Sequence, residues 1–197
     1  MEIKTDKLEV IANAEVGCIV GRFQTHKLHQ GHKDLINEVL KNHKKVIVFI
    51  GSSRVPNTKK NPLDYASREK MLRAEYGNKI ICVQITDQRT NEAWSQILDS
   101  KINETFPDKK SVIYGSRDSF IGSYTGKKPV IELEPSGDYN ATNIRAEVAR
   151  ETLESEDFRA GIIYSNYNYR PVTYPTVDVC AYNQEGEILL AKKPNEN

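Results

Sequence analysis

The residues best placed to do chemistry are histidines near the start of the chain. Three of the four histidines, His26, His29 and His32, fall in one short stretch that follows an apolar run at residues 16–20. His29 and His32 are three residues apart, so at the start of a helix both imidazole rings can point toward one site. Gly31 has no Cβ atom and lets a ligand approach the backbone. Imidazole and backbone N–H groups bind phosphate oxygens at such places, so the pattern predicts a phosphate site.

The same histidines permit two other interpretations. A metal site needs a third and usually a fourth ligand, which His26 would have to supply, and the adjacent Lys27 disfavours a cation there. In the third interpretation the histidines belong to an ordinary solvated loop and cap a helix. Residue spacing favours phosphate binding and leaves the other two open.

The elements that must hold these residues alternate along the chain. Apolar runs rich in β-branched residues predict strands at residues 16–20, 46–50, 79–85, 111–114 and 130–133. Amphipathic stretches predict helices around the stripe Leu35, Ile36, Val39 and Leu40 and at residues 65–76, 92–105 and 142–153. This order predicts an α/β fold with a Rossmann-like, doubly wound parallel sheet. Ligands of such sheets bind beyond the carboxyl ends of the strands, which is where the histidines lie.

The character of the sequence changes near Tyr164. Residues 164–175 are rich in Tyr and Asn, contain two prolines, and are predicted to be a linker. Residues 176–182 and 187–193 then alternate around turn residues 183–186, which predicts a C-terminal β-hairpin. Two strands alone are only marginally stable, so we expect the hairpin to pack on something or to belong to a larger domain.

Composition narrows the classes of protein. The chain of 197 residues is long enough for one domain, or for one domain and a fragment. Its 28 Lys and Arg nearly balance its 27 Asp and Glu, which argues against a nucleic-acid partner but not against small phosphorylated ligands. No apolar run reaches the ~18 residues of a membrane helix, and the N-terminus lacks an export signal. Cys18, Cys82 and Cys180 fit neither a disulfide nor a zinc pattern, so we expect a cytoplasmic protein without a membrane partner.

Beyond these patterns, the sequence resembles a known enzyme family. Gly21-Arg22-Phe23-Gln24 followed by His29-Gln30-Gly31-His32 is similar to the first-strand motif of the HxGH nucleotidyltransferases. The four residues 25–28 include a small insertion, and Thr25 stands where a Pro is common in the family. The opening tetrapeptide is most similar to archaeal-type nicotinamide mononucleotide adenylyltransferases, including bacterial and phage versions fused to a Nudix hydrolase. Further segments agree in the family's order, namely residues 51–54, 60–63, 68–69, 86–94 and 140–145.

The resemblance implies a reaction and a set of residues for it. The 5′-phosphate of nicotinamide mononucleotide attacks the α-phosphorus of ATP, and NAD and pyrophosphate form; the protein positions the reactants and neutralises charge. The implied catalytic residues are Arg22, His29, His32 and Arg145, with Mg²⁺ as the cofactor that bridges the triphosphate. The implied ATP-binding residues follow strands or open helices: Gly21, Arg22, Phe23, Gln24, Gly31, His32, Gly115, Ser116, Asn140, Ala141, Thr142 and Arg145.

One of these segments has an ordinary alternative. In residues 140–145, Ala141 and Thr142 open a helix and Arg145 follows one turn later, which suits a phosphate clamp. A helix cap with Arg145 facing solvent is the alternative.

The acceptor side rests on a second group of residues. The resemblance implies that Asn91 holds the nicotinamide carboxamide and that Trp94, the only tryptophan, stacks on the pyridine ring. Asn61 and Arg54 complete the implied nicotinamide-nucleotide site. A core tryptophan that anchors its helix is the alternative for Trp94.

The resemblance also assigns the domains. It implies a nucleotidyltransferase domain at residues 1–163, the linker at 164–175, and a truncated Nudix hairpin at 176–197. The sequence contains no Glu-Glu pair of a Nudix box, so hydrolase activity is not expected in this chain. Two functions remain as alternatives: adenylylation of another acceptor, such as a flavin or pantetheine phosphate, and a nucleotide-binding regulator without turnover. The oligomeric state stays open, a homo-oligomer included.

Overall fold

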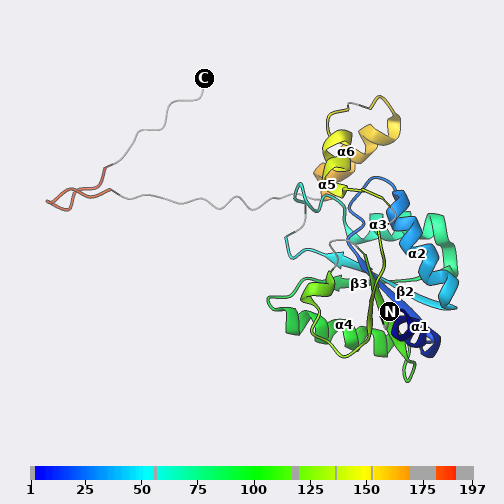
Figure 1. The fold of residues 1–197 in the computed structure, drawn as a ribbon. Coiled ribbons are helices and arrows are strands. Elements are labelled where there is room, and N and C mark those ends of the chain that lie inside the picture. The colour runs from blue at the N-terminus through cyan, green and yellow to red at the C-terminus, as the bar shows by residue number, and fades with distance from the viewer. Residues whose placement is uncertain are drawn as a thin grey trace. The chain divides into compact units, whose positions relative to one another are not determined.

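A parallel sheet organises the first part of the chain. The computed structural model describes residues 3–55, 57–116, 120–135, 137–151, 153–168 and 181–189. The strands are β1 (Val16–Gly21), β2 (Lys45–Ser52), β3 (Ile81–Thr86), β4 (Ser111–Gly115) and β5 (Val130–Glu132). They lie in the order β3-β2-β1-β4-β5, and each pairs with its neighbours in parallel (Figure 1). The predicted α/β fold with a doubly wound parallel sheet is confirmed.

Helices cover both faces of the sheet. The helices of the described residues are α1 (Ile3–Asn13), α2 (Gln30–Asn42), α3 (Tyr65–Tyr76), α4 (Asn91–Thr105), α5 (Ala141–Val148) and, in a separate unit, α6 (Glu156–Asn168), with short 3₁₀ turns η1 (Gly77–Lys79) and η2 (Phe120–Ser123). Side chains of α1, α2 and α3 pack with Ile19, Val48 and Tyr114 on one face. Side chains of α4 and η2 pack with Cys18 and other apolar side chains on the opposite face. Burial of both faces explains why the strands are apolar almost throughout.

Local capping residues set the starts of three helices. The side chains of Asp64, Thr90 and Asn140 accept hydrogen bonds from backbone N–H groups in the first turns of α3, α4 and α5. Such caps satisfy donors that have no partner inside the helix. They fix where each helix begins, at the edge of the sheet where ligands bind.

Two helices differ from the prediction. The structure contains α1, which the sequence patterns did not predict, and its Val10 and Ile11 pack against the core beneath the sheet. The helix predicted at residues 142–153 is shorter, because α5 ends at Val148 and the N–H of Arg150 turns back to the carbonyl of Glu147. The predicted Leu153 terminus of this helix was therefore wrong.

The chain divides into two compact units, residues 1–152 and 153–197. In the second unit, α6 runs to Asn168 and so includes the first residues of the predicted linker. Residues 183–186 form a turn next to an antiparallel bridge between Tyr182 and Ile188, as the hairpin prediction requires. The rest of the predicted linker and hairpin, residues 169–180 and 190–197, lies outside the described residues. The domain boundaries stay a prediction.

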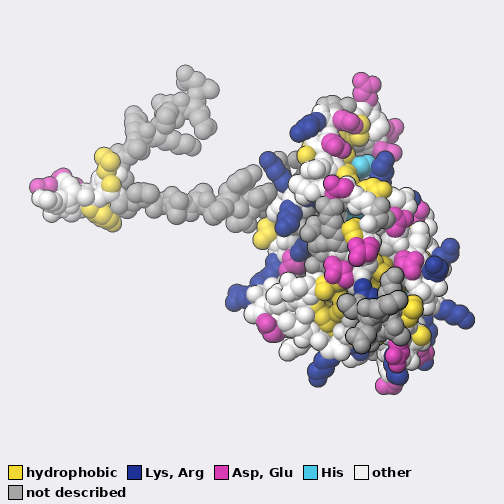
Figure 2. All heavy atoms as spheres, in the orientation of Figure 1, with side chains coloured by type: hydrophobic (Ala, Val, Ile, Leu, Met, Phe, Trp, Pro, Cys, Tyr) yellow, Lys and Arg dark blue, Asp and Glu magenta, His cyan; other side chains and the backbone are white. Residues whose placement is uncertain are grey.

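The surface carries charges of both signs. On the face shown in Figure 2, Lys, Arg, Asp and Glu side chains are interspersed rather than gathered in one patch of either sign. Among the described residues, no helix has both the length and the apolar character needed to cross a bilayer.

Candidate active site

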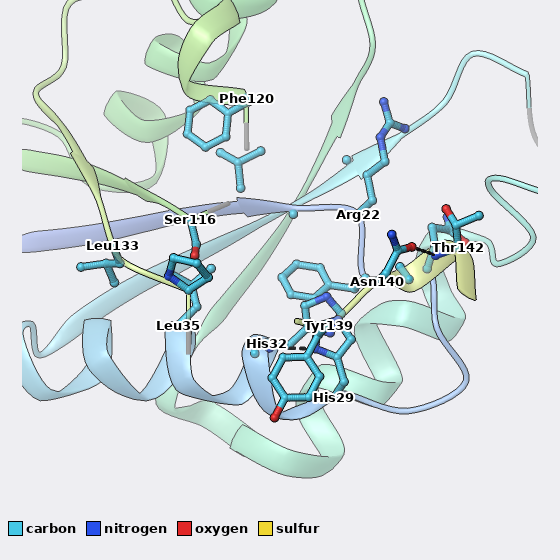
Figure 3. A pocket seen from close by; sticks show the side chains of 18 of the residues that line it. Arg22, His29, His32, Leu35, Ser116, Phe120, Leu133, Tyr139, Asn140 and Thr142 are labelled. Atoms are coloured by element: carbon cyan, nitrogen blue, oxygen red, sulfur yellow. Dashed lines mark hydrogen bonds between the residues drawn. The ribbon is translucent and has the colours of Figure 1, made fainter. Parts of the chain in front are cut away.

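A large open cleft lies at the carboxyl ends of the strands. Its volume is about 1210 Å³, and its walls come from the ends of β1 and β2, the starts of α2, α4 and α5, and the segments after β3, β4 and β5. Figure 3 shows His29, His32 and Tyr139 together in one part of it, with Leu35, Ser116 and Leu133 in another. The chain switches from one side of β1 to the other at β4, and such switch points are where ligands of doubly wound sheets bind.

The two histidines lie at the first turn of α2. His29 is the N-cap residue, and its Nδ1 accepts a hydrogen bond of 3.3 Å from the backbone N–H of His32. Because Nδ1 is an acceptor, the proton of the neutral His29 ring is on Nε2 and is available as a donor. The rings of His29 and His32 are stacked, with centroids 3.6 Å apart. Both imidazoles are thus held at one helix N-terminus, as their spacing predicted.

Burial keeps these histidines neutral. It lowers the pKa of His32 to about 3, with a smaller contribution from His29, and it also lowers the pKa of His29. The Nδ1 atom of His32 is buried and has no hydrogen-bond partner among the described residues. Two neutral imidazoles can each donate one N–H to an anion without the cost of bringing two like charges together.

The turn after β1 is shaped by its residues. Phe23 has a positive φ of 48°, and its buried ring packs against His32 at 4.9 Å. A Cβ atom on Gly21 would lie 2.7 Å from that ring, so only glycine leaves room for it. Gly21 and Phe23 therefore determine the position of His32, whether or not they also contact a nucleotide.

Arg22 reaches across the cleft mouth. Its Nη2 donates to both carboxylate oxygens of Asp87, at 2.9 and 2.7 Å, and its Nη1 donates to the amide oxygen of Asn61 at 3.2 Å. Asp87 follows directly after β3, so the ion pair links the ends of two strands that lie on either side of β2. Sequence reasoning gave Asp87 no role, although its place after a predicted strand was a usable signal.

Gln24 and Arg145 hold the loop before α3. The Gln24 side-chain amide donates to the carbonyl of Leu63 at 3.0 Å and accepts from its N–H at 2.8 Å. The Arg145 guanidinium donates to the carbonyls of Lys59 and Gln24 and to the hydroxyl of Thr142. Three of its five N–H groups are used in this way, which leaves two for a phosphate. Arg145 is therefore tied into the cleft wall and does not simply face solvent.

The buried side chain of Arg68 also stabilises this region. Its buried guanidinium donates to the carbonyls of Arg22, Gly51 and Asp64 and to the hydroxyl of Ser52. Burial lowers the pKa of this guanidinium. Arg68 joins the ends of β1 and β2 and so fixes the backbone on which Arg22 stands.

Asn140 opens α5. Its Oδ1 accepts from the N–H groups of Thr142 and Asn143, at 2.9 and 3.2 Å (Figure 3). This side-chain oxygen is therefore used for capping, and Thr142 and Arg145 carry the donors that remain for a ligand. The helix-cap alternative from the sequence is correct for Asn140, and it coexists with a cleft-lining Arg145.

The acceptor-side residues lie at the start of α4. Thr90 is the N-cap, so Asn91 is the first helical residue, and both line the cleft with Trp94. The Trp94 ring packs against Phe120 at 5.6 Å and against the core on this face of the sheet. Trp94 thus anchors its helix and also borders the cleft, which combines the two interpretations from the sequence.

Most of the predicted site residues meet in this cleft. Three do not line it: Gly115 is a buried strand residue, Asn61 reaches the site only through Arg22, and Arg54 lies on an exposed loop. Lining residues that sequence reasoning did not assign include Leu35, Glu38, Lys60, Asp87, Phe120, Leu133 and Tyr139. In the described parts of the chain, no group of three or more His, Cys, Asp or Glu side chains is arranged to hold a metal ion.

Comparisons with known proteins agree with this geometry. Residues 18–147 match the cytidylyltransferase-like family. The nicotinamide-nucleotide adenylyltransferase of Thermococcus sibiricus is 36% identical over 90 residues, which are 43% of this chain and 47% of that protein. The enzyme of the same name from Thermoplasma volcanium is 24% identical over 139 residues, 67% of this chain and 74% of that protein.

A solved structure shares the fold. The bifunctional NMN adenylyltransferase/ADP ribose pyrophosphatase from Francisella tularensis superposes with a TM-score of 0.64 at 20% identity, over 78% of this chain and 50% of that one. This chain thus spans about half the length of the Francisella protein and of the Thermococcus relative.

Proposed function

The chain belongs to the cytidylyltransferase-like family, and from this premise we propose that it is a nicotinamide-nucleotide adenylyltransferase. It would join ATP and nicotinamide mononucleotide to NAD and release pyrophosphate, a step of NAD biosynthesis or salvage. The relatives named nicotinamide-nucleotide adenylyltransferase support the choice of reaction within this broad family.

The observation that carries the proposal is the pair of neutral imidazoles at the start of α2. His29 and His32 stack on each other in a cleft that also holds Arg22 and Arg145. A pentavalent α-phosphorus carries more negative charge on its oxygens than ATP does. Fixed N–H donors at that position stabilise the transition state more than the bound substrate.

The proposed reaction is a single in-line displacement. A phosphate oxygen of nicotinamide mononucleotide forms a bond to the α-phosphorus of ATP, while the bond from that phosphorus to the bridging oxygen of the β-phosphate breaks. Pyrophosphate leaves with the electron pair of that bond. The nucleophile is already an anion, so no general base is needed, and the side chains orient the reactants and offset their charge.

Magnesium enters the proposal as part of the substrate. ATP would bind as its Mg²⁺ complex, in which phosphate oxygens hold the ion and the ion offsets the charge of the triphosphate. The cleft's own cations, Arg22, Lys60 and Arg145, complement this charge. No step is assigned to a metal held by protein side chains.

The acceptor end of the cleft suits a flat amide-bearing ring. Asn91 supplies an amide that can pair with a carboxamide, and Trp94 supplies an indole edge or face beside it. Arg22 lines the same cleft as Asn91 and the histidines, and its guanidinium is suited to bind the phosphate of the mononucleotide. We propose the nicotinamide mononucleotide site there, with Asn61 contributing through Arg22.

A pyrophosphate-release assay with an acceptor panel tests the proposal. The full chain is incubated with ATP, Mg²⁺ and, in separate reactions, nicotinamide mononucleotide, flavin mononucleotide or phosphopantetheine. We expect release with nicotinamide mononucleotide, equal amounts of NAD, and little release with the other two. Faster turnover of another acceptor would reassign the substrate, and binding of ATP without turnover of any acceptor would favour a regulator.

The remaining sequence predictions stay predictions. The Nudix assignment of residues 176–197 concerns a segment that is largely outside the described residues. The cytoplasmic setting is consistent with Cys18 and Cys82, which are buried and unpaired in the structure.

A further inference from the structure

Four aromatic rings form a continuous column through the phosphate end of the cleft. Tyr139 stacks on His29 with centroids 5.2 Å apart and planes within 8° of parallel. His29 stacks on His32 at 3.6 Å, and the ring of Phe23 packs against His32 at 4.9 Å. Phe23 is buried, whereas Tyr139 is 41% exposed, so the column runs from the core to the surface; Figure 3 shows His29, His32 and Tyr139.

The chain leaves a fitted space for the exposed end of this column. A Cβ atom on Gly31 would lie 2.9 Å from Cδ2 of Tyr139, and one on Gly137 would lie 2.8 Å from its Cε2. Real Cβ atoms do not approach ring carbons so closely, so side chains at either position would displace the ring. Gly31 was predicted to admit a phosphate, but in this structure the neighbouring space holds the rings of Tyr139 and His29.

His29 depends on its neighbours for its orientation. The one hydrogen bond that its ring makes to the described residues is the long 3.3 Å contact from the backbone N–H of His32 to Nδ1. This bond determines which nitrogen carries the proton, but a single long bond restrains rotation of the ring only weakly. His32 covers one face of the ring and Tyr139 covers the other. Removing Tyr139 would expose that second face to water and free the ring to turn.

We propose that Tyr139 is a positioning residue for adenylyl transfer, which clamps His29 between itself and His32 so that the His29 Nε2–H points at the reacting phosphates. The inference rests on the proposed function, because it assigns a role within that reaction. It concerns the ring of Tyr139 and not its hydroxyl, which makes no hydrogen bond to the described residues. A phenylalanine at position 139 should therefore keep the positioning role, whereas an alanine should lose it.

Steady-state kinetics give the first test. For Tyr139→Ala we expect kcat to fall about 10- to 100-fold, because a misaligned donor loses transition-state contact, while KM for both nucleotides stays within about two-fold. Tyr139→Phe should keep most of the wild-type kcat. Tyr164→Ala is the matched control, since Tyr164 is another exposed tyrosine, on α6, and is not among the described residues that line the cleft.

The kinetic outcomes separate the proposal from its rivals. A raised KM with kcat intact would show that Tyr139 binds substrate directly. An equal loss in Tyr139→Phe and Tyr139→Ala would assign the effect to the hydroxyl. Either result would overturn the positioning role, whereas failure of the wild-type chain to make NAD would overturn the proposed function itself.

Nuclear magnetic resonance of the ligand-free chain tests the stack without any activity. The four histidines give few imidazole signals, which single histidine substitutions assign. We expect the His29 ring protons of the wild type to be shifted upfield by the face of Tyr139. The shift should be lost in Tyr139→Ala, be kept in Tyr139→Phe, and be unaffected by Tyr164→Ala. Unchanged His29 signals in Tyr139→Ala would disprove the clamp even in an active enzyme.

Discussion

At the scale of single residues, the two ring nitrogens of His29 lie in different surroundings. Its Nδ1 caps α2, and its Nε2–H is left for a ligand. His32 has no capping role, and burial sets its pKa near 3, so it stays neutral at any pH at which ATP binds as a fully charged anion. Substitutions can therefore separate the structural and the chemical part of the pair.

We expect His32→Ala and His29→Asn to lower kcat by about 10²–10³-fold with small changes in KM, since each removes an imidazole N–H that the shorter side chain cannot replace at the same position. Asparagine at position 29 can still cap the helix, so this variant should keep its thermal stability. His26→Ala is the control, because His26 is exposed and does not line the cleft. Turnover and KM for both nucleotides are measured, and a change confined to KM would argue against the assigned role.

Trp94 should affect binding rather than rate. Stacking on the nicotinamide ring is the same before and during the reaction, so Trp94→Ala should weaken acceptor binding by ~1–3 kcal/mol and raise its KM, with KM for ATP nearly unchanged. Trp94 also packs on Phe120, so Trp94→Phe is needed as a variant that keeps the core filled. If both variants unfold at the same denaturant concentration as the wild type and bind the acceptor normally, the stacking assignment is wrong.

The histidines also make stability depend on pH. The folded-state pKa of His32 lies below its ordinary value of 6.5, so on acidification the unfolded chain takes up the proton first. The contribution of His32 to the free energy of unfolding is fully present above pH ~6.5. It is lost as the pH falls toward 3, at up to ~1.4 kcal/mol per pH unit. Burial lowers the pKa values of His29 and His43 in the same direction. Urea unfolding at pH 7.5 and 5.0 should show a marked loss for the wild type and a smaller loss for His32→Gln.

At the scale of elements, the sequence predicted helix bounds correctly where residues next to the helix end determine them. The bounds of α3 were predicted from the sequence, because Asp64 caps its start and Gly77, with a positive φ of 56°, ends it. The start of α2 followed from the histidine pattern and its apolar stripe. By contrast, α1 was not predicted, and it is stabilised by packing of Val10 and Ile11 against the core, a contact with segments distant in the sequence.

Single residues of the site could be predicted from the sequence, but the contacts between distant segments could not. Helix starts and strand ends located the histidines from the sequence, and the family resemblance added Arg145 and Trp94. The Arg22–Asp87 ion pair and the Gln24–Leu63 contacts join segments 65 and 39 residues apart, which no local pattern encodes. The same holds for Tyr139, which meets His29 only because α5 begins beside α2 in the fold.

Arg68 gives a test of these long-range connections. Arg68→Met leaves the carbonyls of Arg22 and Gly51 without their donor in a buried place, so we expect a loss of about 3 kcal/mol in the free energy of unfolding. Arg73→Ala, on the same helix, removes only an exposed pair with Glu69 and should change stability little. Denaturant unfolding of both variants decides the matter, and equal small effects would show that Arg68 does not hold the strand ends together.

At the scale of the whole molecule, the described residues that line the cleft all come from the first compact unit. They fall between Val20 and Arg145, and that unit comprises residues 1–152. The switch in strand order at β1 and β4 already brings together the loops that build the cleft. Residues 153–197 form the second unit and are not among the described residues that line the cleft.

We expect a shortened chain of residues 1–152 to fold and to keep adenylyl transfer close to the full chain, in both kcat and KM. The physical reason is that the sheet, both of its apolar cores and every cleft-lining side chain are retained. Circular dichroism and a denaturant melt establish that it folds, and pyrophosphate release with ATP and nicotinamide mononucleotide measures the activity. His32→Ala in the shortened chain is the inactive control. If the shortened chain folds with the same unfolding midpoint but loses turnover, residues 153–197 must supply part of the site, and the cleft described above would be incomplete.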